Sequence, residues 1–463
     1  MLWKSRAAAS TSESKEQRKQ AMLTEDIKTL IPRMAVPTIV AQMITTIYNI
    51  VDTYFVSTLG TNATAAVGVN SSLQRMITLI GSLIGAGACS YIARLLGAKR
   101  EEDANRVLST SFFIGLGLAV LFMIIGRISV HPLVFMLGAT QECAQFSIDY
   151  ATYVLYAAPF MIGSFILNMC LRSEGSAMFA MIGIGFGGIL NCFLDPLFIY
   201  KLGLGVAGAS MATTISQIVS FCILITPYIR KQSSCEIALC LFKPVAEDIR
   251  QVLAIGSTSF FRSAFSVVAV VLLNRVAGTY STAALAAISV ANRVMEFPFA
   301  AILGFGQGFQ PIAGFNWGAK RMDRVKSSYQ FAARVSVIGA VIVGVLLLIT
   351  AGPIVRIFNS QADPEVQRLG ILGIRTQCLA LWIHSWGSIV NMFYAGIGKA
   401  KQALLMSTAR QGYCLIPVLF IAPVLFGVNG IACSQAMADL LSLAVIIPLA
   451  VKIRTLVKEN EAS

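Results

Sequence analysis

The feature that most constrains this chain is a series of mostly apolar stretches, each about 20 residues long, that recur along nearly its whole length. A helix needs about 20 such residues to cross a hydrocarbon core about 30 Å thick, so each stretch predicts a membrane-spanning helix. Of the 463 residues, 56% are hydrophobic and 13% are charged, which does not suit a soluble surface. Strand-like alternation is absent, and helices satisfy their own backbone hydrogen bonds in lipid. The sequence therefore predicts an all-α integral membrane protein rather than a β-barrel.

Twelve spans are predicted, at residues 36–58, 64–92, 107–126, 149–171, 178–200, 204–228, 250–274, 281–311, 329–350, 371–397, 402–425 and 429–451. One set of alternate connectors, which includes both chain ends, is rich in lysine and arginine. The other set holds only Arg127, Lys201, Arg275, Arg356, Arg368 and Arg375. By the positive-inside rule we expect both termini in the cytoplasm, which requires an even number of spans. The expected location is the cell membrane, either a plasma membrane or a bacterial inner membrane.

The net charge of +14 raises the question of nucleic-acid binding, and the position of the charge argues against it. The basic residues lie in connectors, whereas the phenylalanines lie inside apolar runs and cannot form a basic stacking face. The first 35 residues are polar and contain no pattern of a removable signal peptide. The ten cysteines form no CxxC pair and are interpreted as small buried hydrophobic residues rather than disulfides or metal ligands.

The two halves of the chain match each other at an offset of about 221 to 223 residues. The sequence GAKR occurs at 97–100 and 318–321, Asn-Met occurs at 168–169 and 391–392, and Gly-Val-x-Gly occurs at 205–208 and 427–430. With six spans each, both halves enter the membrane in the same direction, which predicts two pseudo-symmetric six-helix lobes around a central site. The expected divisions are a cytoplasmic segment at 1–35, lobes at 36–228 and 250–451, a linker at 229–249 and a tail at 452–463.

Asp52 lies within the first span, where an ionised carboxylate costs about 2.5 to 3.5 kcal/mol on the mildest insertion scale. Such a residue usually faces a cavity or a polar partner. Tyr48 and Asn49 precede it by four and three residues and share its helix face, so they are its expected neighbours. The alternative is a carboxylate that is only hydrogen-bonded inside the bundle.

Asp195 lies near the outer end of the fifth span, one helical turn after Asn191 and directly before Pro196. Proline has no backbone N–H, so the carbonyl of Cys192 loses its usual partner and becomes available to an ion or water. Carboxylate, amide and carbonyl oxygens together suit a sodium ion. A proton requires only a buried carboxylate with a second carboxylate nearby. The alternative is an interfacial aspartate that caps the connector.

Charged residues in the second half of the chain support weaker functional predictions than Asp52 and Asp195 do. Arg293 and Glu296 are three residues apart in the eighth span and could neutralise each other. Otherwise Glu296 would present a negative group to a cationic substrate. Met295 and Phe297 could line a pliable apolar pocket, or could pack against lipid or other helices. His384 in the tenth span is a further tentative cavity residue, although such a histidine is more often simply hydrogen-bonded in the bundle.

The sequences YNIVDT at 48–53 and NCFLDP at 191–196, together with the two GAKR connectors, resemble the multidrug and toxic compound extrusion family from about residue 25 to the end. The resemblance implies an ion-coupled exporter whose lobes open alternately to the cytoplasm and the exterior. It also implies a cation site in the first lobe that combines the acids of the first and fifth spans with a hydroxyl of the sixth span. Thr213 fits that hydroxyl best, although Thr214 beside it could serve.

One branch of the family uses acids in the second lobe, but here the position matching Asp52 is Leu273 or Asn274. The seventh span offers Arg262 and the tenth His384, neither of which is an acid, so the sequence does not support that coupling mechanism. Asp439 in the twelfth span is either neutralised within the bundle or a cavity acid.

We therefore expect an antiporter that uses protons or sodium ions, needs no other cofactor and expels amphipathic, cationic drugs or toxic compounds. Its expected partners are such small molecules and membrane lipid, with no nucleic acid. The first alternative is a related flippase for a lipid-linked saccharide or cell-wall precursor, which should carry more cationic side chains in its cavity. A membrane-embedded enzyme is the second, but the chain lacks a P-loop and any intramembrane catalytic signature, so no enzyme activity is expected.

Overall fold

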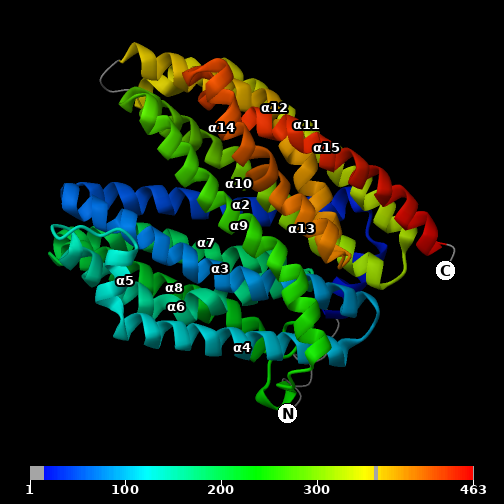
Figure 1. The fold of residues 1–463 in the computed structure, drawn as a ribbon. Coiled ribbons are helices and arrows are strands. Elements are labelled where there is room, and N and C mark those ends of the chain that lie inside the picture. Colours follow the sequence, from blue (N-terminus) through cyan, green and yellow to red (C-terminus); the bar gives the residue numbers. More distant parts are fainter. Residues whose placement is uncertain (1–14, 359–362, 462–463) are drawn as a thin grey trace.

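The fold is seen in a computed structural model that describes residues 15–358 and 363–461. Those residues form helices, turns and loops and contain no strand. Two bundles lie side by side at one end of the molecule and diverge toward the other, so that the protein has the outline of a V (Figure 1). The described beginning and end of the chain both lie near the end where the bundles meet, which we call the closed end (Figure 1).

The first lobe contains six long helices. They are α2 (Ile27–Ser57), α3 (Thr61–Gly97), α4 (Glu101–Ile128), α6 (Ala144–Ser173), α7 (Ala177–Pro196) and α8 (Gly205–Ile229). A short helix, α5 (Val130–Met136), lies between α4 and α6 and was not predicted. After Pro196 the chain continues as a π-helical turn, η1 (Leu197–Lys201). Pro196 thus ends the regular α-helix beside Asp195, as its missing backbone N–H predicts.

The second lobe repeats this plan. It consists of α9 (Ala246–Tyr280), α10 (Thr282–Gly318), α11 (Met322–Phe358), α12 (Pro364–Gly396), a broken helix made of α13 (Ala400–Thr408), η3 (Ala409–Cys414) and α14 (Leu415–Phe426), and α15 (Val428–Glu461). Eleven of the long helices are apolar enough to cross a membrane, and α12 packs among α10, α11 and α15. The predicted all-α membrane fold with two six-helix lobes is confirmed. The π-helical break in the eleventh span was not predicted.

Most helices extend beyond the spans predicted from hydropathy. The second span was predicted at 64–92, whereas α3 runs over Thr61–Gly97, and α15 continues through the charged segment that follows residue 451. Hydropathy detects only the part of a helix that suits lipid, whereas backbone hydrogen bonding continues into the polar ends. The outer faces agree with a lipid environment, because large exposed apolar side chains gather on α4 and α11, such as Ile124, Ile128, Leu346 and Ile349.

The sequence repeat has a structural counterpart. The Asn168 side-chain amide donates to the Ala180 carbonyl at 2.8 Å, and Asn391 donates to the Ala403 carbonyl at 2.7 Å. Both bonds join the fourth helix of a lobe to its fifth. The GAKR connectors also match, since the lysines at 99 and 320 have φ values of 60° and 57°. The matched residues therefore perform the same structural task in each lobe.

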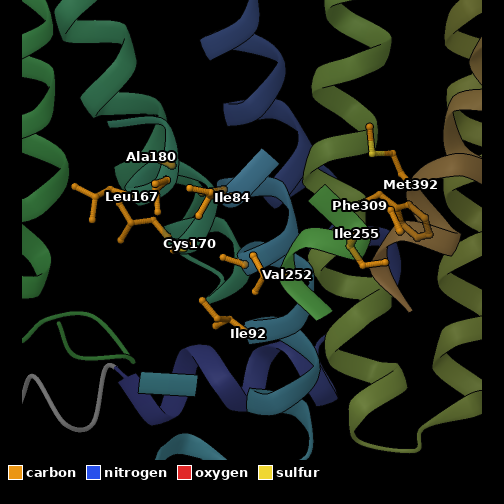
Figure 2. Close-up of a cluster of buried hydrophobic side chains, with 14 of the residues drawn as sticks. Ile84, Ile92, Leu167, Cys170, Ala180, Val252, Ile255, Phe309 and Met392 are labelled. Carbon is orange, nitrogen blue, oxygen red and sulfur yellow. The ribbon is translucent and has the colours of Figure 1, made fainter. Parts of the chain in front are cut away.

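The closed end depends on glycines that allow backbones from the two lobes to touch. A Cβ atom on Gly87 of α3 would lie 1.9 Å from the Val252 carbonyl oxygen of α9, and one on Gly256 would lie 1.6 Å from that of Leu83. Only glycine permits this approach. Ile84 and Ile92 of α3 belong to the same buried apolar cluster as Val252, Ile255, Phe309 and Met392 of the second lobe (Figure 2).

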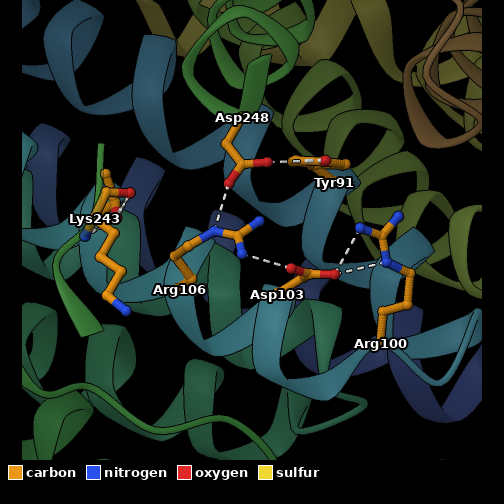
Figure 3. A network of polar contacts seen from close by, with 7 residues as sticks. Tyr91, Arg100, Asp103, Arg106, Lys243 and Asp248 are labelled. Atoms are coloured by element: carbon orange, nitrogen blue, oxygen red, sulfur yellow. Dashed lines mark hydrogen bonds and ion pairs between the residues drawn. The ribbon is translucent and has the colours of Figure 1, made fainter. Parts of the chain in front are cut away.

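The linker between the lobes is docked on the first lobe. Asp248, at the start of α9, accepts hydrogen bonds from Arg106 at 2.9 Å and Tyr91 at 3.1 Å (Figure 3). Glu174, between α6 and α7, is 2% exposed and accepts from the Ser234 backbone N–H at 2.7 Å and the Cys235 N–H at 3.2 Å. Burial raises the pKa of Glu174 above the ordinary value of a glutamate, although these donors partly oppose the shift.

Candidate functional site

Polar side chains from α2, α6, α7 and α8 form a buried cluster inside the first lobe, here called the N-lobe cluster: Asp52, Tyr150, Asn191, Asp195 and Thr213. Asp195 is completely buried, and its Oδ1 accepts a hydrogen bond from the Asn191 side-chain amide at 3.1 Å. The same amide donates to Thr213 Oγ1 at 3.3 Å. The structure thus brings together the acid, amide and hydroxyl that the sequence assigned to one site.

Asp52 joins this cluster from α2. It is 9% exposed, and its Oδ2 accepts a long hydrogen bond, 3.4 Å, from the Tyr150 hydroxyl. Tyr150 is 1% exposed and also accepts from the Gln74 side-chain amide at 3.2 Å. Sequence reasoning did not identify Tyr150. No local pattern marks it, because its role depends on α6 lying beside α2, and it is distant from Asp52 in the sequence.

The N-lobe cluster has more acceptors than donors. Three buried oxygens have no hydrogen-bond partner in the part of the chain that the structure describes, namely Asp52 Oδ1, Asn191 Oδ1 and Asp195 Oδ2. Within residues 15–358 and 363–461, neither aspartate forms an ion pair with lysine, arginine or histidine. Buried polar oxygens are normally satisfied, so three unsatisfied oxygens in one cluster indicate a site for a positively charged species. A small cation bound to these oxygens would satisfy them, and a proton on either carboxylate would supply one hydrogen-bond donor and remove one negative charge.

The remaining predicted members of this site lie at its edge. The Tyr48 ring packs on α7, where a Cβ at Gly188 would lie 3.1 Å from Tyr48 Cδ1. The Asn49 side chain is exposed and makes no hydrogen bond to the cluster. The Thr214 hydroxyl donates to the Ser210 carbonyl of its own helix at 2.8 Å, which leaves Thr213 as the hydroxyl in the cluster. A role for Tyr48 or Asn49 in ion binding stays a prediction.

A cavity of about 520 Å³ lies between the lobes. Its walls come from α2 and α3 of the first lobe and from α9, α10, α12, α13, η3 and α15 of the second. Of the five residues tentatively assigned to a substrate cavity, Glu296 and His384 line it, whereas Arg293, Met295 and Phe297 are not among its lining residues. Met295 is fully buried in a separate apolar cluster, and Arg293 is exposed. No ion pair joins Arg293 to Glu296, although both residues are described.

The second lobe places its own buried acid beside this cavity. Asp439 is 1% exposed, and its Oδ1 lies 2.6 Å from Arg410 Nε and 3.8 Å from His384 Nδ1. The Arg410 guanidinium also stacks over the Phe299 ring, 4.7 Å from its centroid. Asp439 therefore has a fixed counter-ion, which the acids of the N-lobe cluster lack.

Comparison with known proteins identifies a family whose model matches this chain. The MatE family model matches two segments, residues 37–197 and 259–421, which together cover more than half of the chain. The segments begin at corresponding positions of the two sequence repeats. This chain belongs to the MatE family. The predicted resemblance is confirmed, and the chain is a multi-pass membrane transporter of that family.

Relatives of this MatE protein are named as exporters. The chain is 27% identical over 406 residues to the multidrug export protein MepA of Staphylococcus saprophyticus, covering 88% of this chain and 89% of that protein. MepA of Staphylococcus aureus gives 27% identity over 408 residues with the same coverage. A solved structure described as an outward-facing multidrug resistance MATE transporter aligns with a TM-score of 0.89 at 26% identity, covering 96% of this chain and 98% of that one.

Proposed function

We propose that this protein is a cation-coupled antiporter that exports amphipathic organic compounds by alternating access, with sodium ions or protons as the coupling species. The observation that carries the proposal is the set of three buried, unsatisfied oxygens in the N-lobe cluster, none of which faces a fixed counter-ion. Export of drugs is the named activity of its MepA relatives, and export by this chain rests on that likeness.

The donor set fits a sodium ion. Carboxylate oxygens of Asp52 and Asp195, the amide oxygen of Asn191 and the hydroxyl of Thr213 are hard oxygen ligands, which suit small hard cations. Those residues would hold sodium, and the bound ion would supply only charge. The same carboxylates could instead take up a proton. In either case the bound positive charge neutralises one of the two buried carboxylates and so lowers the cost of burying them together.

Coupling requires that the cation and the substrate favour different conformations. The lobes touch at the closed end and diverge at the other (Figure 1). The positive-inside rule predicts that the termini, and hence the closed end, face the cytoplasm. The conformation seen here is then outward-facing, in agreement with its likeness to an outward-facing relative. The inward-facing state must separate the backbones that meet at Gly87 and Gly256.

The α2 helix connects the proposed cation site with the cavity between the lobes. It contributes Asp52 to the N-lobe cluster and Gln42, Thr45 and Thr46 to the cavity wall. It also contains Pro32 and Pro37, and each proline removes one backbone hydrogen bond, which lowers the cost of bending the helix. Cation binding at Asp52 would therefore change the shape of α2 and so the substrate cavity. Glu296 is an acid of the cavity wall that has no ion-pair partner among the described residues, and it would accept a cationic group of the substrate.

The test uses purified protein in proteoliposomes, with sodium and pH gradients imposed separately and export of a fluorescent organic cation as the readout. Asp52→Asn should abolish gradient-dependent export. Asp149→Asn is the matched control, because Asp149 is an aspartate of α6 beside Tyr150 whose carboxylate is already bonded by Gln145 at 2.8 Å. Unchanged export by the Asp52 variant would contradict the proposal, whereas the gradient that supports wild-type export identifies the coupling ion.

One observation supports the alternative of a flippase for a lipid-linked precursor: the cavity is lined by three arginines, Arg75, Arg262 and Arg410. Such a protein would move lipid-linked pyrophosphate between leaflets and would bind it in competition with the fluorescent cation. A lack of competition by a lipid pyrophosphate would leave drug export as the function.

A further inference from the structure

The cavity between the lobes contains more positive charge than its acids neutralise. Its lining has three arginines, Arg75, Arg262 and Arg410, and two acids, Glu296 and Asp439. Arg410 and Asp439 neutralise each other at 2.6 Å. In the described part of the chain, neither Arg75 nor Arg262 forms an ion pair or a side-chain hydrogen bond. Two unpaired guanidinium groups therefore share a cavity with one unpaired carboxylate.

The two unpaired arginines come from opposite lobes and lie at similar depth. The backbones of α3 and α9 touch where Gly256 meets Leu83. Arg262 is six residues from Gly256, and Arg75 is eight residues from Leu83, both toward the end where the lobes diverge. At a rise of 1.5 Å per residue these separations are about 9 and 12 Å. Both guanidinium groups thus enter the cavity just beyond the point where the lobes part.

The surroundings of Arg262 suit an anion. Ser263 and Ser266 of α9 line the same cavity, and within the described residues neither hydroxyl is engaged in a hydrogen bond. Ser266 is one helical turn from Arg262 and so lies on the same face of α9. A guanidinium group binds carboxylate or phosphate with two parallel hydrogen bonds, and hydroxyl groups can donate others. Arg262 is half-buried, so its unpaired charge is costly there and favours a ligand that brings the opposite charge, whereas Arg75 is exposed and would add charge at the rim of the cavity.

We propose that Arg262 and Arg75 bind the acidic group, a carboxylate or phosphate, of an amphipathic substrate between the two lobes. This inference rests on the proposed export function and extends its substrates from simple organic cations to organic acids and zwitterions. The apolar part of the substrate lies against Val267, Phe299 and Leu303, which line the same cavity. Glu296 receives an amine where the substrate carries one. Because one arginine belongs to each lobe, an anion that contacts both of them bridges the lobes.

The test compares three probes that share one ring system: pyrenebutyric acid, its neutral carboxamide and a trimethylammonium analogue. Binding to purified protein is measured by fluorescence titration. The wild type should bind the acid about tenfold more tightly than the carboxamide, as expected for hydrogen bonds to a charged group. Arg262→Gln should remove that preference, and Arg75→Gln should reduce it. Arg293→Gln is the control, because Arg293 is an exposed arginine of α10 outside the cavity lining and should leave it unchanged.

Two results would overturn the proposal: equal binding of acid and carboxamide by the wild type, or an undiminished preference in the variant that lacks both arginines. Binding of the trimethylammonium analogue shows that each variant is folded. Gradient-driven export of that analogue tests the proposed function separately, since it can persist when acid binding fails and can be lost while acid binding remains.

The source of the acidic group is tested by competition against bound pyrenebutyric acid. Stronger displacement by farnesyl pyrophosphate than by non-fluorescent 4-phenylbutyric acid supports the site with a lipid pyrophosphate as its ligand. The reverse order supports the site with a soluble organic acid, and displacement by neither compound contradicts the proposal.

Discussion

In the first lobe, Asp195 is completely buried, and its one hydrogen-bond partner is the neutral amide of Asn191. In the second lobe, Asp439 is just as deeply buried but has the guanidinium group of Arg410 at 2.6 Å. The lobes share helix order, connectors and amide contacts, yet they treat a buried carboxylate in opposite ways. A paired acid stabilises one structure, whereas an unpaired acid is left for a mobile positive charge. The same scaffold therefore supports a structural acid on one side and a candidate coupling site on the other.

The largest effect is expected at Asp439. Asp439→Ala would leave the Arg410 guanidinium buried without its counter-ion, which costs about 3 to 5 kcal/mol. Thermal unfolding in detergent should show this loss, and adding Arg410→Gln should restore much of it. If the single variant unfolds at the wild-type temperature, Asp439 is not held in a stabilising pair and the contrast between the lobes is lost.

Asp195→Asn should give the opposite result. Removing a buried charge that has no counter-ion should leave the unfolding temperature unchanged or raise it. The affinity of the coupling cation should fall by about 10- to 100-fold, as is usual when a ligand set is disturbed. Binding of radiolabelled sodium, and proton release on sodium addition, would measure this. An Asp195 variant that is unstable but binds the cation normally would show that Asp195 is a structural acid rather than a coupling acid.

Glu174 is a third buried carboxylate and is satisfied by backbone and hydroxyl donors rather than by a mobile cation. Glu174→Ala should expose the linker to trypsin at Arg230 and Lys231, because two buried N–H groups lose their acceptor at about 1 to 3 kcal/mol each. Ordinary transport of the cationic probe should persist. A linker that resists cleavage as well as the wild type does would show that Glu174 does not hold it.

The same residue predicts a pH dependence of linker docking. Burial raises the pKa of Glu174 in the folded protein, so its protonated form is favoured there. The contribution to docking is fully present below the ordinary glutamate pKa and declines as the pH rises through the raised value. Cleavage of the wild type relative to the Ala variant should therefore increase with pH. A constant ratio would contradict this assignment.

The smallest effect is expected at Tyr150. Tyr150→Phe keeps the ring in place and removes the hydroxyl that contacts Asp52 at 3.4 Å and Gln74 at 3.2 Å. Cation affinity should change by roughly 2- to 10-fold, the value of one net hydrogen bond. The matched variant Tyr153→Phe, in the same helix but outside the cluster, should leave the cation affinity unchanged. Identical binding by both variants would exclude Tyr150 from the site.

Local sequence signals predicted several features of the molecule. Asp52 and Asp195 could be selected because each lies in an apolar run, where an ionised side chain is costly and usually has a functional role. Asn191 followed from helical spacing, whereas the π-helical turn after Pro196 was not predicted, because the fifth span was expected to run to residue 200. The break in the eleventh span was missed because π-helical turns have no simple hydropathy signal. Arg293 was predicted as a possible ion-pair partner of Glu296, and Met295 and Phe297 as members of a pliable apolar pocket. Neighbours in a helix point in different directions, and only Glu296 of this group lines the cavity.

The sequence by itself determined the membrane fold, the two six-helix halves and the family, because apolar length, charge bias and repeated motifs are properties of local segments. The tertiary structure alone decided that Tyr150 contacts Asp52, that Thr213 rather than Thr214 joins Asn191, and that Arg75 and Arg262 share one cavity. These contacts join residues from different helices, so they depend on how helices rotate and cross. Packing sets those rotations, and no segment encodes them alone.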